Sequence, residues 1–267
     1  MKLTFGFSPC PNDTFMFHGI ASGIMQLENC DFSIQLHDVE TLNQMAMKSH
    51  LDITKISFYA WLNVKNNYQL LNSGSALGHG CGPVLISKQN VKHDEIPRLR
   101  IVLPGKWTTA HLLFRLWAPE AVNKIFVDYG QIFDCLMSDV ADLGVIIHES
   151  RFTFEKAGFK TVVDLGAWWE NETKMPIPLG CIVVKNTVPD EIKKRLDVLI
   201  KNSIKYAMTN PNKSLPYIKK HAQETGDAIL QKHIKTFVND FSLDLGDKGN
   251  AAVKKLEDMA RLAGVIC

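Results

Sequence analysis

The feature that most constrains the fold of this chain is a regular alternation of short β-rich runs with helical patterns. Runs of apolar and β-branched residues predict strands over 3–7, 32–37, 52–56, 84–87, 100–103, 124–127, 143–147 and 181–184. The spacing of apolar residues between these runs predicts helices over 13–21, 41–48, 108–117 and 132–138. Such an alternation is typical of a mainly parallel sheet with helices on its faces, so we expect an α/β fold.

The pattern changes at Pro189, after which no further strand is predicted. Pro189 and the two acidic residues that follow it are typical of a helix start. The helix that follows has an apolar face made of Ile192, Leu196, Leu199, Ile200 and Ile204. Further helices are expected over 215–222, 227–241 and 249–263. A chain that builds one α/β unit, then a second, and ends in helices that return to the first predicts two lobes: residues 1–87 with 188–267, and residues 88–187.

Composition and charge favour a small-molecule protein. The chain has 267 residues, of which 46% are hydrophobic and 22% charged, as in ordinary globular proteins. Its 30 Lys and Arg against 28 Asp and Glu leave a formal charge of only +2, spread evenly along the sequence. This balance argues against nucleic acid as the main partner.

The cysteines and the N-terminus carry two further expectations. The six cysteines, at positions 10, 30, 81, 135, 181 and 267, lie at least twenty positions apart, so no CxxC metal or redox spacing is present and free thiols are expected. The first residues contain one Lys and a short apolar stretch that Pro9 and Pro11 interrupt. This segment resembles neither a signal peptide nor a membrane span, and a cytoplasmic protein is expected.

Two segments of the predicted first lobe contain candidate binding residues. In SPCPNDTFMFHG, Asn12 or Asp13 is expected to cap a helix whose free N–H groups suit an anion. The sequence is equally compatible with an ordinary strand-to-helix turn that binds no ligand. His18 in this segment is expected to be a packed or surface residue. In DITKISFYAW, Lys55 and Ser57 follow a strand at the sheet edge where α/β proteins bind ligands, and an ordinary surface lysine is equally compatible.

Two segments of the predicted second lobe place polar residues at strand ends. In LPGKWTTAHLLFRLW, Thr108 or Thr109 is expected to cap a helix, which brings hydroxyls and free N–H groups together as a carboxylate pocket. In LGVIIHESRF, His148 ends a buried strand and suits general-base chemistry. A structural histidine remains the alternative, and either Glu149 or Ser150 is a candidate to orient His148.

Two more segments are less specific. In GSALGHGCGP the glycines are spaced too irregularly for a dinucleotide or phosphate loop, so no nucleotide cofactor is expected, and Cys81 is expected to be a packed thiol. In DLGAWWENE the two tryptophans, Trp168 and Trp169, belong either to the core or to a lid.

Taken in order, seven fragments resemble one family over nearly the whole chain. The fragments are SPCPNDTFMFHG, DITKIS, ALGHGCGP, LPGKWTTAHLL, VIIHESRF, DLGAWWENET and PIPLGCIVV. They resemble the 1,4-dihydroxy-6-naphthoate synthases, the MqnD family of the futalosine route to menaquinone. The family often has arginine where this chain has His79. The resemblance implies a two-lobed fold similar to type II periplasmic binding proteins, with the ligand in a central cleft between lobes that the chain crosses twice.

The resemblance also implies an activity and a set of site residues. The activity is a carbon–carbon lyase reaction that converts cyclic dehypoxanthinyl futalosine to 1,4-dihydroxy-6-naphthoate and dihydroxyacetone without a metal or redox cofactor. His148 would be the general base. The substrate contacts would be Lys55, Ile56, Ser57, Thr108, Thr109 and Ala110. The alternatives are chorismate dehydratase, of the same pathway and fold, and a non-catalytic small-molecule binding protein.

Overall fold

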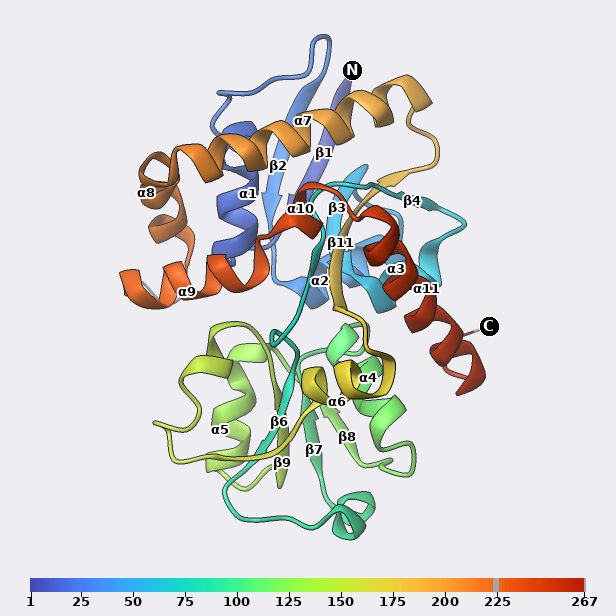
Figure 1. Ribbon diagram of the computed structural model, residues 1–267, viewed down its shortest axis with the longest axis vertical. Coiled ribbons are helices and arrows are strands. Elements are labelled where there is room, and N and C mark those ends of the chain that lie inside the picture. Colours follow the sequence, from blue (N-terminus) through green and yellow to red (C-terminus); the bar gives the residue numbers. More distant parts are fainter. Residues whose placement is uncertain (223–225, 267) are drawn as a thin grey trace.

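The computed structural model describes residues 1–222 and 226–266, which fold into two α/β lobes (Figure 1). Each lobe is built on its own sheet. The first sheet has the order β2-β1-β3-β11-β4, and β5 pairs with another part of β11. Its strands are β1 (Lys2–Phe7), β2 (Asp31–Leu36), β3 (Ile53–Ser57), β4 (Tyr68–Leu70), β5 (Ala76–Gly78) and β11 (Ile177–Lys185).

The second sheet has the order β10-β6-β9-β7-β8. Its strands are β6 (Val84–Ser87), β7 (Ile101–Leu103), β8 (Lys124–Phe126), β9 (Leu143–Ile146) and β10 (Lys160–Asp164). In both sheets only part of the pairing is parallel: β1 is parallel to β2 and β3, and β7 to β8 and β9, whereas β6 and β11 are antiparallel to every partner. The prediction of α/β layers is therefore confirmed, but that of mainly parallel sheets is wrong.

The strand pairing also corrects the predicted lobe boundaries. Residues 84–87, expected at the end of the first lobe, form β6 between β9 and β10 of the second sheet. Residues 181–184, expected in the second lobe, belong to β11, which pairs with β3 of the first sheet. The chain thus crosses between lobes before β6 and again before β11, some residues earlier than predicted. The cause is that an apolar run predicts that a segment forms a strand, but it does not predict which other strand this segment pairs with.

Helices cover the sheets. Those of the first lobe are α1 (Pro11–Ala21), α2 (Val39–Met47), α3 (Phe58–Val64), α7 (Asp190–Thr209), α8 (Pro211–His221), α9 (Asp227–Phe237), α10 (Asp240–Leu243) and α11 (Gly246–Leu262). Those that follow strands of the second sheet are α4 (Thr109–Trp117), α5 (Ile132–Met137) and α6 (Leu165–Thr173). The described residues also include short 3₁₀ helices, namely η1 (His93–Arg98), η2 (Tyr129–Gln131) and η3 (His148–Phe152).

The chain after Pro189 returns to the first lobe. The predicted apolar face of α7 packs against α1, and Leu196, Ile200 and Ile204 are fully buried there. Because α8 and α9 also contact α1, nearly every residue of α1 is buried. This packing fixes the N-terminal end of α1, which lies beside the space between the lobes (Figure 1).

Two further predictions concern the cysteines and the membrane. Cys10, Cys30, Cys81, Cys135 and Cys181 are free thiols, as predicted, and Cys267 lies outside the described residues. Among the helices of residues 1–222 and 226–266, none combines the length and hydropathy that a membrane crossing requires.

Candidate active site

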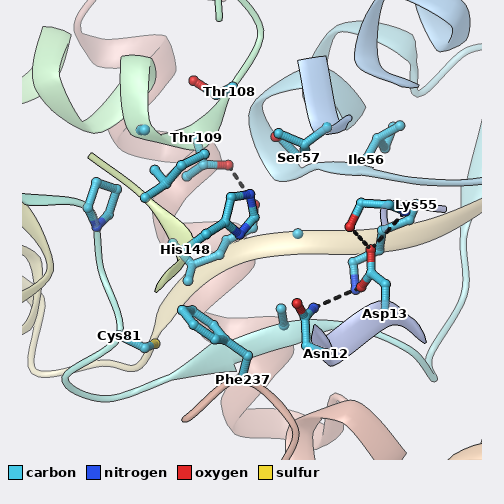
Figure 2. A pocket seen from close by; sticks show the side chains of 18 of the residues that line it. Asn12, Asp13, Lys55, Ile56, Ser57, Cys81, Thr108, Thr109, His148 and Phe237 are labelled. Carbon is cyan, nitrogen blue, oxygen red and sulfur yellow. Dashed lines mark hydrogen bonds and ion pairs between the residues drawn. The ribbon is translucent and has the colours of Figure 1, made fainter. Parts of the chain in front are cut away.

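A cavity lies between the two lobes and is lined by residues of both (Figure 2). It encloses about 680 Å³ of empty space, including its opening to solvent. The lining residues are Ser8, Asn12, Asp13, Val39, Lys55, Ile56, Ser57, Ala76, Cys81, Gly82, Pro83, Thr108, Thr109, Ala110, Ile147, His148, Leu179, Gly180 and Phe237. All seven site residues that the family resemblance implies are in this set, although they come from three separate segments.

His148 reaches the cavity from the carboxyl end of β9, as predicted. Its backbone has a φ of 57°, a left-handed conformation that non-glycine residues adopt rarely and that turns the chain from β9 into η3. Its Nε2 lies 3.7 Å from the Cys10 Sγ, and the Tyr129 ring packs edge-on against the imidazole at 5.0 Å between centroids. Burial lowers the pKa of His148 below its ordinary value, against the opposing charges of Glu149 and Asp13. The imidazole is therefore neutral at pH 7 and able to accept a proton.

A second histidine, which is not among the predicted site residues, lies behind His148. His233 of α9 is fully buried, and its ring lies 16° from parallel to that of His148, with the centroids 6.1 Å apart. Its Nε2 is 2.9 Å from the Asn12 Oδ1, and its Nδ1 is 3.7 Å from the Glu149 Oε2. Of the two residues predicted to orient His148, Glu149 is thus the one in contact with this cluster. A lone histidine in an amphipathic helix carries no local signal for such a position.

Lys55 lies at the cavity as predicted, but its ammonium group is already paired. Its Nζ is 3.1 Å from the Asp13 Oδ1 and donates a hydrogen bond of 2.7 Å to the Gly74 carbonyl. Asp13 also accepts hydrogen bonds from the Ser8 N–H and hydroxyl. Neither side chain is more than 6% exposed, so Lys55 is not the surface lysine of the alternative interpretation. Its charge is balanced by Asp13 before any ligand binds.

The α1 start differs from the prediction. The helix begins at Pro11 and Cys10 occupies the N-cap position, whereas Asn12 or Asp13 was expected to cap it. Proline is favoured in the first helical turn because its missing N–H is not needed there. Asn12 and Asp13 are consequently free to point into the cavity, with the Asn12 amide donating to the Asp13 carboxylate at 2.8 Å (Figure 2).

Hydroxyl groups line the opposite wall. Thr108 is the N-cap of α4, since its Oγ1 accepts the His111 N–H at 3.2 Å. The Thr109 hydroxyl instead donates to the Leu179 carbonyl of β11 at 2.8 Å and accepts the Tyr59 N–H at 3.3 Å. It thereby connects α4 with the first lobe. The Thr109 and Ala110 N–H groups, at the start of α4, have no partner within the helix and are suited to an anionic group.

Ser57 completes the polar lining from the end of β3. Its Oγ accepts a hydrogen bond of 3.2 Å from the Asn43 amide, and its N–H donates to the Asn43 Oδ1 at 2.8 Å. The hydroxyl proton of Ser57 is free to turn toward a ligand. The cavity therefore offers the Ser57 hydroxyl, helix N–H groups and one neutral imidazole, within largely apolar walls, whereas the Thr108 and Thr109 hydroxyl protons are donated to the Gly105 and Leu179 carbonyls.

The glycine-rich segment forms the crossing between β5 and β6. A Cβ added to Gly82 would lie 2.6 Å from the Gly166 N, so the two backbones touch at this crossing. Cys81 is buried, and burial raises the pKa of its thiol to about 12, in agreement with the predicted packed thiol. His79 is exposed and contacts the Glu170 carboxylate at 3.0 Å. Trp169 is a core residue with no exposed surface.

A protein metal centre needs several ligating side chains close together. Within the part of the chain that the structure describes, no three His, Cys, Asp or Glu side chains come together as a metal-ligand set.

The family of the chain follows from comparison with known proteins. The model of a family described as menaquinone biosynthesis matches residues 3–262. A curated protein of Thermus thermophilus named 1,4-dihydroxy-6-naphthoate synthase is 40% identical over 98% of this chain and 95% of its own length. One of the same name from Streptomyces coelicolor is 35% identical over 99% of this chain and 94% of its own.

Solved structures agree on the fold. A protein of Archaeoglobus fulgidus is 29% identical, with a TM-score of 0.93 over 99% of this chain and 98% of its own. The alkanesulfonate-binding protein SsuA of Xanthomonas axonopodis has a TM-score of 0.75 over 100% of this chain and 94% of its own, at 9% identity, which shows that the fold is that of periplasmic binding proteins. With nearly its full length matched at up to 40% identity, the chain belongs to the menaquinone biosynthesis family.

Proposed function

We propose that this protein is a 1,4-dihydroxy-6-naphthoate synthase that acts as a carbon–carbon lyase on cyclic dehypoxanthinyl futalosine. The products are 1,4-dihydroxy-6-naphthoate and dihydroxyacetone. The observation that carries the proposal is that His148, neutral at pH 7, lies in one cavity with the six residues expected to contact the substrate. Both curated relatives bear the name of this activity.

His148 is the general base in this proposal. It removes a proton from the sugar-derived part of the substrate, and the electron pair left behind drives cleavage of the carbon–carbon bond to the three-carbon fragment. The naphthoate fragment keeps the electron pair of the broken bond and takes up the proton that His148 returns. The lowered pKa of His148 keeps the base unprotonated, while the apolar walls and the two lobes exclude water from the reacting atoms.

The remaining residues hold the substrate. Ser57 supplies a hydroxyl group, and the first turn of α4 supplies the N–H groups of Thr109 and Ala110, which bind a carboxylate and hydroxyl groups. Thr108 caps this turn and contributes to the same wall. Lys55 acts through its ion pair with Asp13, which fixes this wall of the cavity, rather than as an unpaired cation. Ile56 contributes apolar surface beside them.

Two other functions are less well supported. Chorismate dehydratase is not the name of either curated relative. A non-catalytic binding protein would have the same fold as SsuA, but at 9% identity that likeness bears on the fold alone.

The test is to incubate the purified protein with cyclic dehypoxanthinyl futalosine and to follow the products by mass spectrometry. We expect dihydroxynaphthoate and dihydroxyacetone in equal amounts from the native chain, and a loss of about 10²-fold or more in kcat for His148→Gln. The matched control is His18→Gln, which replaces a buried histidine outside the cavity. Substrate binding without turnover by the native protein would contradict the proposal, and full turnover by His148→Gln would remove His148 as the base.

A further inference from the structure

Three polar residues from distant parts of the chain meet behind His148. Asn12 comes from α1, Glu149 from η3 and His233 from α9. His233 has no exposed surface, and Asn12 and Glu149 are at most 7% exposed. The cluster has no part in holding substrate in the mechanism proposed above, yet His233 stacks on the proposed base.

The hydrogen bonds of Asn12 fix which ring nitrogen of His233 carries hydrogen. The Asn12 Nδ2 donates to the Asp13 carboxylate at 2.8 Å, so the carbonyl oxygen of this amide is the atom that faces His233. That oxygen lies 2.9 Å from the His233 Nε2 and can only accept. The His233 Nε2 must therefore be protonated.

The other ring nitrogen of His233 faces the Glu149 carboxyl group. The Nδ1 lies 3.7 Å from the Glu149 Oε2, and neither atom has a hydrogen-bond partner in residues 1–222 and 226–266. With Nε2 protonated, a neutral ring presents its lone pair at Nδ1 to the carboxyl group. Two buried lone pairs in this arrangement are destabilising unless one proton lies between them.

We propose that His233 is a positioning residue for His148: Asn12 fixes its tautomer, and it shares one proton with Glu149, so that the carboxylate charge beside the base is neutralised. The net charge of the pair is zero whether the proton resides on Glu149 or on the His233 Nδ1. The inference rests on the proposed function only in taking His148 as the base. The effect on His148 itself can be measured without turnover.

The electrostatic surroundings of His148 give the direction of the effect. An uncompensated Glu149 carboxylate raises the pKa of His148, which burial lowers. Burial and the nearby His148 also lower the pKa of His233, which favours its neutral form. The titratable and charged groups around His148 are Cys10 at the N-cap of α1, Asp13 of α1, Asp38 at the start of α2, Lys55 of β3, Tyr129 of η2, Glu149 of η3 and His233 of α9.

The first experiment measures the His233 tautomer in the native chain. Protein labelled with ¹⁵N-histidine is examined by long-range ¹H–¹⁵N NMR between pH 5 and 8, and single His→Gln variants assign the signals. We expect the His233 Nε2 to be protonated at pH 7. A neutral ring that carries hydrogen on Nδ1 alone would overturn the proposal, and this result does not depend on the folding of a variant.

The second experiment measures how the cluster affects His148. In His233→Gln the amide takes the place of Nε2 and keeps a donor toward Asn12, but nothing shares a proton with Glu149. We expect the pKa of His148 to rise by about 0.5 to 1 unit, and the acid limb of kcat/KM to move by the same amount. In the double variant His233→Gln/Glu149→Gln, which removes the charge, we expect both to return toward the native values.

The controls separate this role from a structural one. His18→Gln removes another buried histidine, whose Nδ1 lies 3.3 Å from the Ser214 Oγ, and should leave the His148 titration unchanged. If His233→Gln fails to fold, His233→Asn is used, with Glu149→Gln as its partner. An unchanged His148 titration in the His233 variant, or the same shift in the double variant, would overturn the proposal. A shifted titration in a protein without turnover would instead contradict the proposed function alone.

Discussion

The Asp13 carboxylate and the Lys55 ammonium group form an ion pair of 3.1 Å in the wall of the cavity, with both side chains at most 6% exposed. The pair links α1 to β3, the two elements that contribute polar residues from the first lobe. Because neither charge can be hydrated, each depends on the other. The ion pair therefore fixes the relative positions of α1 and β3 at the site.

Removal of one charge from this pair should be strongly destabilising. We expect Lys55→Met to lower the free energy of unfolding by about 3 to 5 kcal/mol, because it leaves the Asp13 carboxylate buried without a counter-ion. The double variant Asp13→Asn/Lys55→Met should lose less than the sum of the single variants. Urea denaturation measures all three.

The chain offers a matched control for this prediction. Lys185 and Asp52 form an ion pair of the same length, 3.1 Å, but their side chains are 21% and 26% exposed. We expect Lys185→Met to cost about 1 kcal/mol or less, because water screens the charge that remains. Equal losses for Lys55→Met and Lys185→Met would show that burial does not govern the strength of the first pair.

The contact of Gly82 with Gly166 should not tolerate a side chain. Gly82→Ala would place a Cβ 2.6 Å from a backbone nitrogen at the crossing between the lobes, and backbone cannot move aside as a flexible side chain does. We expect a loss of about 1 to 3 kcal/mol in the free energy of unfolding and a fall in kcat/KM. Gly130→Ala is the control, since no described atom outside its chain neighbours lies within 4 Å of the position that its new Cβ would take. Equal free energies of unfolding for Gly82→Ala and Gly130→Ala would contradict the close approach of the Gly82 and Gly166 backbones.

The Thr109 hydroxyl connects the lobes, and its removal should affect substrate binding. Thr109→Val keeps the shape of the side chain but loses the bonds to the Leu179 carbonyl and the Tyr59 N–H. We expect a loss of about 1 to 3 kcal/mol in the free energy of unfolding and a higher KM, because buried partners are left unpaired. Thr109→Ser, which retains the hydroxyl, should behave like the native chain. If Thr109→Val and Thr109→Ser had the same KM in steady-state kinetics, a role of the hydroxyl in substrate binding would be excluded.

Local sequence patterns were sufficient for several parts of the site. His148 follows an apolar run, so its position at the carboxyl end of a buried strand could be predicted, and Thr108 precedes an amphipathic helix that it caps. Both predictions depend on neighbours in the sequence. The structure adds that His148 and Thr108 line the same cavity.

Contacts between distant segments could not be predicted in this way. The sequence separates Asn12 from His233 by 221 positions. The C-terminal helices were predicted to return to the first lobe, but no local pattern indicates that α9 packs against α1. The Lys55 side chain was expected to be available to a ligand because its partner, Asp13, belongs to another element. The short strands β4 and β5 have three residues each, too few to show a period. Strand order, which decides the lobe of β6 and β11, depends on packing rather than on the composition of either strand.

The buried histidines should make the protein less stable in weak acid. His111 donates from Nδ1 to the Lys106 carbonyl at 2.7 Å, while its buried Nε2 has no hydrogen-bond partner among the described residues. Burial lowers the pKa of His111 to about 4, from about 6.5 in the unfolded chain. Between these values the unfolded chain binds more protons than the folded one, so stability falls as the pH falls below about 6.5.

The size of this effect can be isolated with one substitution. From pH 7 to pH 5 the linkage predicts a loss of about 2 kcal/mol from His111 alone. His111→Phe cannot take up a proton, so its free energy of unfolding should be about 2 kcal/mol less sensitive to that change of pH, whatever its stability at pH 7. Urea denaturation at pH 5, 6 and 7 gives the comparison. The control is His79→Phe, which replaces an exposed histidine. If the free energy of unfolding of His111→Phe changed with pH as much as that of the native chain, other groups would be responsible for the loss of stability.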